Sequence, residues 1–351
     1  MKKIKEMFAN VFAKVKQLDV YKNKRIFYIV PLFVILVMLI CGMCYQLSNT
    51  KQYFANIGID FQGGTILTIE FKDADANSEK YDQNLKVISD VLEEQGISIS
   101  RDQKSGESTI IVQYVNFKKG EGANDAKEMN LINQSIKDTL RQKSADGEIS
   151  TILTINDTTI GNTSSKNLLK TAAIAVAVAL ACMLLYIIIR FDLYSALATI
   201  VALLHDLIIM MSLSVIFYVE IGDSIVAALI TIVAYSINNT IVVFDKIRSN
   251  VKPYKQSKAS YDVKEIVNKS IFGTMTRTIY TTFTTLIVMI ILVAIGVASI
   301  RTFGLPIIFG LLAGFYSSVF IAAPLWADFK SIGAKLVQNR KNRKYKKSHA
   351  K

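Results

Sequence analysis

Cysteine, histidine and charged residues are scarce in this chain of 351 residues. Charged residues make up 20% of it, whereas about a quarter is typical of soluble domains. The three cysteines, Cys41, Cys44 and Cys182, all lie within apolar runs, so we expect no disulfide framework in the polar part of the chain. With only two histidines, His205 and His349, we expect no metal site either.

The short motifs of soluble enzymes are absent as well. The sequence contains no Walker loop, no HExxH, no GxSxG and no CxxC pair outside the apolar runs. We therefore expect neither catalytic residues nor a cofactor, and the chain is not expected to be an enzyme. Its basic start lacks the small-residue cleavage pattern of a signal peptide, so the first apolar run is predicted to be an uncleaved anchor.

Apolar sequence is what the chain has in abundance. Hydrophobic residues make up 51% of it, and the mean hydropathy is +0.34. Several apolar runs reach about 20 residues, the length at which a helix spans a bilayer. This pattern excludes a cytosolic enzyme, a disordered chain and a small disulfide scaffold. Six membrane-spanning helices are predicted, over residues 26–46, 168–189, 194–218, 224–244, 278–296 and 304–326.

Charge is divided unevenly along the chain. Basic residues exceed acidic ones by six in 1–46, by five in 245–277 and by eight in 328–351, whereas acidic residues are in excess by five in 47–166. Membrane proteins retain Lys and Arg on the cytoplasmic side. This topology explains the net charge of +13 without nucleic acid as a specific ligand, although the basic tail could also touch membrane lipid. The predicted divisions are a cytoplasmic N-terminus (1–25), a first span (26–46), an extracytoplasmic domain (47–167), a five-helix bundle (168–326) with a cytoplasmic loop (245–277), and a cytoplasmic basic tail (327–351).

The large polar segment has its own α+β pattern. Strands are predicted where β-branched residues alternate with polar ones, and helices where apolar residues recur at helical spacing. The elements come in the order β-α-β-β-α-β, which is that of the ferredoxin-like fold. The predicted fold class is thus an α-helical polytopic membrane protein with a ferredoxin-like domain between its first two spans. The strands are predicted over 64–71, 96–101, 108–115 and 149–157, and the helices over 78–95 and 124–143.

Polar side chains inside the apolar helices are the candidate functional residues, because each is costly in a membrane. His205 and Asp206 lie near the middle of the third predicted span. An ionised carboxylate buried alone is very unfavourable, so we expect Asp206 to pair, to bind a proton or to face water. Polar residues on the next three spans could line a hydrated path with it: Ser236, Asn238, Asn239, Thr240, Arg277, Thr278, Thr281, Thr282, Thr285, Tyr316, Ser317 and Ser318.

Structural roles are open for several of these residues. Ser and Thr in membrane helices often bond to their own backbone, and an Asn pair such as Asn238 and Asn239 often clamps two helices together. Gly310 and Gly314 are four residues apart, a spacing that lets two helices pack closely. For Asp206 beside a histidine, a functional role in an ion pathway is favoured.

Several motifs together carry a resemblance to a known family. In chain order they are GIDFQGGT (58–65), LLYIIIRFD (184–192), ALLHDL (202–207), AYSINNTIVVFDKIRSN (234–250), TMTRTIYTTFTTL (274–286) and GFYSSVFIAAPL (314–325). These segments resemble the SecF family of Sec translocase subunits, within the resistance-nodulation-division (RND) superfamily. The resemblance covers nearly the whole chain beyond residue 20.

The resemblance implies a multi-pass protein of the bacterial cytoplasmic membrane with both termini in the cytoplasm. It implies SecD as the partner, beside the SecYEG translocon, with YajC and YidC as further candidates. The implied activity is to help preproteins finish crossing the membrane, driven by the proton (or sodium) gradient.

Roles for individual residues follow from the same resemblance. Asn239 departs from the family pattern, because the family usually has an Asp there, which is the suspected proton carrier. An amide cannot titrate, so Asp206, together with carboxylates of SecD, is expected to carry the coupling. The ion-pathway candidates are Asp206, Asn239, Arg277, His205, Asn238, Thr281 and Thr285, and the structural motif residues are Gly58, Asp60, Gly63, Gly64, Asp245, Gly310, Gly314, Ser317 and Ser318.

Two other functions stay open. The chain could be half of an RND-type exporter of small molecules or lipids, although such exporters usually carry twelve spans and two large outer domains in one chain. It could also be a passive scaffold that only holds SecD in place, and Asn239 favours that alternative.

Overall fold

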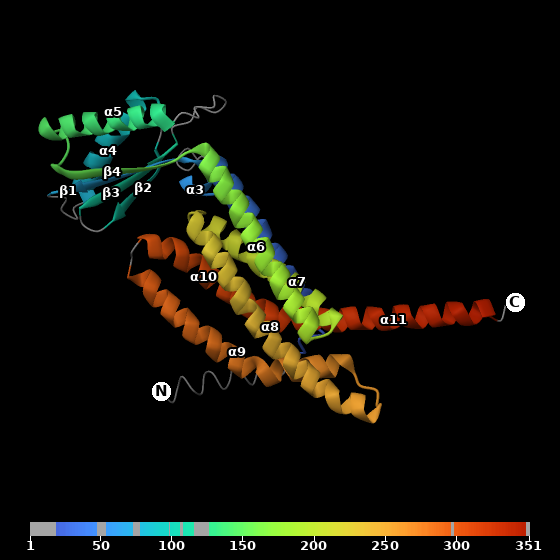
Figure 1. The fold of residues 1–351 in the computed structure, drawn as a ribbon. Helices are drawn as coiled ribbons and strands as arrows, with labels where there is room; N and C mark the ends of the chain where they lie inside the picture. Colours follow the sequence, from blue (N-terminus) through green and yellow to red (C-terminus); the bar gives the residue numbers. More distant parts are fainter. Residues whose placement is uncertain are drawn as a thin grey trace, which may run out of the picture.

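The computed structural model consists of a small α/β domain joined to a bundle of long helices (Figure 1). Most of the predicted N-terminal segment 1–25 and the last three residues of the basic tail lie outside the described residues. The structure describes residues 19–47, 54–72, 78–97, 99–105, 108–115, 126–295 and 298–348.

The α/β domain contains one four-stranded sheet in the order β2-β3-β1-β4, with every neighbouring pair antiparallel. Both long helices of the domain lie on the side of the sheet that faces away from the bundle (Figure 1). The elements follow the predicted β-α-β-β-α-β order. They are β1 (Gly64–Phe71), α4 (Ser78–Glu94), β2 (Ile99–Ser105), β3 (Thr109–Tyr114), α5 (Ala126–Ala145) and β4 (Ile152–Ile160), preceded by the single turn α3 (Ile59–Gln62).

Buried and more exposed side chains alternate along β1, so the sheet has a core face and an opposite face. Leu67, Ile69 and Phe71 are buried beneath the helices, whereas Thr68 is half-buried and Glu70 is exposed on the opposite face. Successive side chains of a strand point to opposite sides, so the two-residue period seen in the sequence decides which residues form the core. The domain core also takes in the helix residues Ile88, Leu92, Ile136 and Leu140.

The bundle contains six helices that are long and apolar enough to cross a membrane, counted over the described residues. This number confirms the six spans predicted from the sequence. The helices are α2 (Lys24–Leu47), α6 (Asn162–Arg190), α7 (Leu193–Ile216), α8 (Asp223–Ser257), α9 (Val263–Ala294) and, in the last span, α10 (Ala298–Ser317), the π-helical turn η1 (Ser318–Ala322) and α11 (Ala323–Ser348).

The expected loop at 245–277 is mostly helical, which corrects the prediction. Helix α8 continues to Ser257 and α9 already begins at Val263, so the connection is only a short turn. The reason is packing: apolar residues at helical spacing in this region, including Val251 and Ile271, are buried in the largest core cluster. Residues 263–276 are the first turns of α9.

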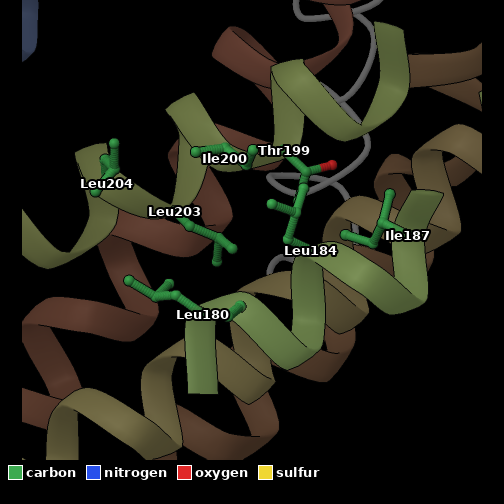
Figure 2. A pocket seen from close by; sticks show the side chains of 8 residues that line it. Leu180, Leu184, Ile187, Thr199, Ile200, Leu203 and Leu204 are labelled. Atoms are coloured by element: carbon green, nitrogen blue, oxygen red, sulfur yellow. The ribbon is translucent and has the colours of Figure 1, made fainter. Parts of the chain in front are cut away.

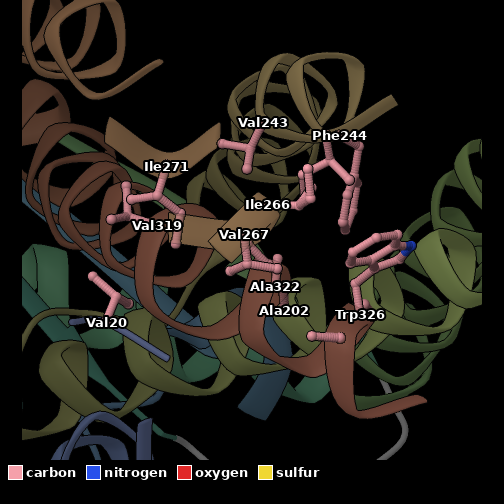
Figure 3. Close-up of a cluster of buried hydrophobic side chains, with 14 of the residues drawn as sticks. Val20, Ala202, Val243, Phe244, Ile266, Val267, Ile271, Val319, Ala322 and Trp326 are labelled. Carbon is pink, nitrogen blue, oxygen red and sulfur yellow. The ribbon is translucent and has the colours of Figure 1, made fainter. Parts of the chain in front are cut away.

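Figure 3 shows the same core cluster in close-up. It includes residues on both sides of the α8–α9 turn, and that turn lies at the end of the bundle remote from the α/β domain (Figure 1). Val20, just before α2, is fully buried in this cluster beside residues of α8, α9 and α11. The Tyr21 hydroxyl donates to Asp328 Oδ1 at 2.8 Å, and the Tyr21 amide donates to Asn268 Oδ1 at 3.2 Å. The start of the first span is therefore tied to both α9 and α11.

The helix of the last span continues beyond the predicted end of that span at residue 326. The predicted span 304–326 is built from α10, η1 and the start of α11, and the predicted basic tail 327–351 is helical as far as Ser348. Helix α11 leaves the bundle and projects away from it (Figure 1).

Candidate functional site

Asp206 is completely buried in the middle of the bundle. It lies on the face of α7 that packs against α8 and α10. A carboxylate in such a place needs hydrogen-bond donors, because burying it alone would cost several kcal/mol.

Three side chains satisfy the Asp206 carboxylate. Oδ1 lies 2.9 Å from Nδ1 of His205, the preceding residue on α7. Oδ2 accepts a hydrogen bond from the hydroxyl of Ser236 on α8, and the hydroxyl of Ser317 at the end of α10 lies 2.9 Å from the same oxygen. The site therefore joins three helices through one carboxylate.

Two glycines bring these helices together. A Cβ atom on Gly314 would lie 3.1 Å from Cβ of Ser236, and one on Gly310 would overlap the side chain of Ile232. Small residues let helix backbones approach closely, which is the packing role expected of the Gly310/Gly314 pair. Without that approach Ser236 and Ser317 would not reach the same carboxylate oxygen.

An aromatic layer covers the histidine side of the site. The His205 ring stacks on Tyr316, with centroids 6.0 Å apart and planes at 22°. The Tyr316 hydroxyl donates to the Phe27 carbonyl of α2 at 2.8 Å. The π-helical turn η1 follows Ser317 directly, and such turns occur frequently at functional sites.

The predicted polar residues of α8 divide between the interior and the surface. Asn239 and Thr240 are buried, one helical turn beyond Ser236, and Asn238 is exposed. Within the described part of the chain, neither Asn239 Nδ2 nor Thr240 Oγ1 has a hydrogen-bond partner. Buried polar groups normally bond to protein or to water, so these two atoms continue the polar character of the site along α8.

The predicted residues of α9 do not join the Asp206 cluster. Arg277 and Thr281 are exposed and Thr285 is half-buried. Among the described residues, no ion pair joins Arg277 to Asp206. The Thr281 and Thr285 hydroxyls bond to backbone carbonyls of their own helix at 3.0 Å, which is the structural alternative considered for them.

Two further predicted motif residues have local contacts. The buried Ser318 hydroxyl donates to the Phe315 carbonyl at 3.0 Å. Asp245 is exposed and lies 3.9 Å from the guanidinium of Arg190, at the end of α6. Both contacts hold helix ends in place and lie outside the carboxylate site.

The glycine-rich segment 58–65 lies where the α/β domain meets the bundle. Gly64 has φ of +144°, and a Cβ there would lie 2.5 Å from the Tyr114 carbonyl oxygen. Gly63 has φ of +77° and ends α3. Asp60 Oδ2 accepts a hydrogen bond from the Asp223 amide, 3.0 Å away at the start of α8. Burial raises the pKa of the Asp60 carboxyl; the hydrogen bond from the Asp223 amide opposes this rise, and the Asp223 carboxylate adds to it.

A cavity of about 120 Å³ lies between α6 and α7 (Figure 2). Its walls are almost entirely aliphatic, formed by side chains such as Leu180, Leu184 and Leu203. The hydroxyl of Thr199 in its wall donates to the Ser195 carbonyl at 2.8 Å. This cavity offers no group for proton or ion chemistry.

The chemistry available at Asp206 is therefore proton exchange. A carboxylate and an imidazole 2.9 Å apart can share one proton, and the two serine hydroxyls can turn to donate or accept. No three His, Cys, Asp or Glu side chains of the described residues form a group that could hold a metal ion.

Comparison with known proteins shows which family the chain belongs to. The family described as "Protein export membrane protein SecD/SecF, C-terminal" matches residues 135–331, more than half of the chain, and "SecD/SecF GG Motif" matches residues 56–75. The chain belongs to the SecD/SecF family. With its six apolar helices, this family member is a multi-pass membrane protein.

Individual SecD/SecF relatives agree with the family match. The chain is 45% identical to the protein translocase subunit SecF of Alicyclobacillus acidocaldarius over 160 residues, which are 46% of this chain and 52% of that protein. It is 30% identical to the SecF of Rickettsia felis over 277 residues, which are 79% of this chain and 83% of that protein. The crystal structure of SecDF from Thermus thermophilus superposes with a TM-score of 0.67 at 28% identity, over 90% of this chain and 39% of the SecDF chain.

Sequence reasoning missed the partnership of Ser236 with Asp206. Ser236 was one of several polar residues on its span, with no signal that it touches the carboxylate. Its spacing of three and four residues from Asn239 and Thr240 places the three on one helix face, and all three are buried. The π-helical turn after Ser317 had no recognisable sequence signal.

Proposed function

We propose that this chain is a SecF-type subunit that acts with SecD to promote protein export across the bacterial cytoplasmic membrane, using the proton or sodium gradient. The observation that carries the proposal is the buried Asp206 with its three polar partners. Ionisable residues within membrane spans are expensive and mark proton or ion pathways. The SecYEG translocon, YajC, YidC and preproteins are the further partners that we propose from family resemblance.

An uncovered polar face on α8 and α9 supports a membrane-embedded partner. Asn238, Arg277 and Thr281 are all exposed on these helices. The 18 residues from Arg277 to Ala294 span about 27 Å at 1.5 Å per residue, so Arg277 lies near the edge of a hydrocarbon core about 30 Å thick. An arginine at that depth can extend its guanidinium to the interface, and a carboxylate on helices of SecD opposite Arg277 would give it an ion-pair partner there. The 39% coverage of the SecDF chain is consistent with that partner.

The topology that we propose places the domain 47–167 outside and both termini inside. The acidic excess in the domain and the basic excess at both ends support it. The α8–α9 turn would then be cytoplasmic, and the α7–α8 turn, at the end of the bundle next to the domain, extracytoplasmic.

The test of coupling is a pair of substitutions assayed for preprotein export with and without an ion gradient. Asp206→Asn should abolish the gradient-dependent part, because the amide cannot exchange a proton. Asn239→Asp should be tolerated or should enhance the gradient-dependent export, because it adds a second titratable group to α8, one helical turn from Ser236. The matched control is Glu265→Gln, which removes an exposed carboxylate from α9 in the same membrane domain and should leave the gradient dependence unchanged.

A second candidate function is a passive scaffold for SecD, and the amide at Asn239 favours it. An unchanged gradient dependence in Asp206→Asn would support the scaffold and place all coupling in the partner. Purification in mild detergent, followed by identification of the co-purifying chains, tests both. Recovery of SecD and SecY is expected, and recovery of neither would contradict the subunit proposal and the scaffold alike.

A further inference from the structure

We infer that Glu220, in the turn between α7 and α8, is a coupling residue that fastens the α/β domain to the two helices carrying Asp206 and Ser236. The attachment itself stands on contacts between described residues. Its consequence for export rests on the proposed function, so the two are tested by separate measurements.

Both carboxylate oxygens of Glu220 bind the sheet of the α/β domain. Oε2 accepts a hydrogen bond from Nη1 of Arg101 on β2, and Oε1 accepts one from Nε2 of Gln113 on β3, at 3.2 Å. The side chains of Arg101 and Glu220 are only 26% and 14% exposed. A charge-assisted contact that is partly withdrawn from water is stronger than an ordinary surface ion pair.

These contacts come from the face of the sheet that α4 and α5 leave uncovered. Arg101 and Gln113 are directly opposite each other across the β2–β3 pair, so their side chains share a face. Gln113 pairs with Ile66 on β1, whereas the neighbouring Leu67 belongs to the core on the helix side. The uncovered face is turned toward the bundle (Figure 1), and Glu220 is the charged group that meets it.

The glycine-rich segment holds the same turn from a second side. Ile221 donates its amide to the Asn56 carbonyl at 2.8 Å and accepts from the Gly58 amide at 3.0 Å. Asp60 adds the bond to the Asp223 amide at the first residue of α8. A Cβ atom on Gly58 would lie 2.9 Å from Oε1 of Glu220, so a side chain at this position would displace the carboxylate.

The turn is also the covalent junction between the two helices of the buried site. Asp206 lies ten residues before Ile216, the last residue of α7, about 15 Å along the helix, and Ser236 follows Asp223, the first residue of α8, by 13, about 20 Å. The hydrogen bond from Ser236 to Asp206 couples α7 and α8 at depth. When that bond is broken or re-formed, a relative shift of the two stiff helices moves the turn, and Glu220 transmits the shift to the sheet.

The experiment reverses the ion pair in the full-length protein, in complex with SecD and reconstituted in nanodiscs. Glu220→Arg and Arg101→Glu are made singly and together, and hydrogen exchange is measured in β2 and in residues 54–64. We expect exchange about tenfold faster in each single variant and restored toward wild type in the double variant. The matched control reverses Lys143 and Glu148, whose 2.9 Å ion pair lies within the α/β domain, and should leave exchange in both segments unchanged.

Asp60 and Asp223 lie close to the turn and could prevent the reversed pair from forming. The Glu220→Ala and Arg101→Ala variants therefore form a second cycle, in which the double variant should exchange no faster than Glu220→Ala alone, because that variant already loses the bonds to both Arg101 and Gln113. Unchanged exchange in all single variants, or fully additive effects in the alanine cycle, would overturn the attachment.

Preprotein export, measured with and without the ion gradient, then tests whether Glu220 acts as a coupling residue. We expect the gradient-dependent part to fall in the single variants and to recover with the exchange rates in the reversed pair. Faster exchange with unchanged gradient-dependent export would overturn the coupling role while leaving the attachment. If Asp206→Asn also left export unchanged, the proposed function would fail, and the exchange data would still decide the attachment.

Discussion

The hydroxyl of Ser236 on α8 donates a hydrogen bond to the carboxylate of Asp206 on α7, thirty residues earlier in the chain. Both residues are almost completely buried. Gly314 on α10 packs directly against the same serine. This one contact fixes the relative position of α7 and α8 in the middle of the bundle.

Ser236→Ala should destabilise the protein by about 1–3 kcal/mol, because it removes a donor from a buried carboxylate. The measurement is thermal unfolding in detergent or nanodiscs. Ser249→Ala is the control, since Ser249 is exposed on the same helix and should change stability by no more than about 0.5 kcal/mol. Equal effects of the two substitutions would show that the bond to Asp206 contributes little.

Gly310→Ala should destabilise the bundle by about 1–3 kcal/mol through overpacking. Its new methyl group would meet the fully buried Ile232 on α8. Ile232→Ala opens space at that contact, so the double variant should lose less stability than the sum of the two single losses. Simple additivity in unfolding measurements would mean that the cost of Gly310→Ala does not arise from its contact with Ile232.

Gly64→Val should reduce accumulation of the protein without preventing membrane insertion. A side chain at this positive φ is strained and meets the Tyr114 carbonyl oxygen, so β1 and β3 could not pair as they do. Gly96→Val is the matched control, because Gly96 also has a positive φ but nothing lies within 4 Å of its Cβ position. It should cost only backbone strain, about 1–2 kcal/mol. Normal accumulation of Gly64→Val would contradict the close-approach argument.

The topology can be tested with single cysteines in a background where Cys41, Cys44 and Cys182 are replaced by serine. A cysteine at the exposed Gln95 of the α/β domain should react with an impermeant thiol reagent in intact cells. One at the exposed Ala259 of the α8–α9 turn should react only after lysis. The reverse labelling pattern would invert the proposed orientation.

Asp60→Asn should stabilise the protein at neutral pH, and its advantage should shrink as the pH is lowered. Burial raises the pKa of Asp60 above its ordinary value of 3.8, so the charged form is disfavoured in the folded state. That cost is relieved as the pH falls through the raised pKa. The asparagine keeps an acceptor for the Asp223 amide and never carries the charge. The measurement is the unfolding midpoint of the wild type and of Asp60→Asn, from neutral to acidic pH. A difference between the two midpoints that does not change with pH would contradict the prediction.

Properties that depend on local sequence could be predicted without the structure. Six spans follow from the length and composition of apolar runs, and the β-α-β-β-α-β order follows from local periodicity. Asp206 stood out because a carboxylate in the middle of an apolar helix is rare and costly. The spacing of four residues between Gly310 and Gly314 predicted, in a similar way, a place where two helices pack closely.

The tertiary structure alone decided which of the polar residues meet. Ser317 reaches Asp206 across 111 residues of sequence, whereas Arg277, on an equally polar helix, faces outward. Helix α8 extends to Ser257 because Val251 is buried by neighbours remote in sequence, and Glu220 meets Arg101 because a turn of the bundle lies under the sheet. Local periodicity tells which side of a helix is polar, but the rotation and crossing of each helix depend on long-range packing, and those decide whether a polar side chain joins the buried carboxylate or the surface.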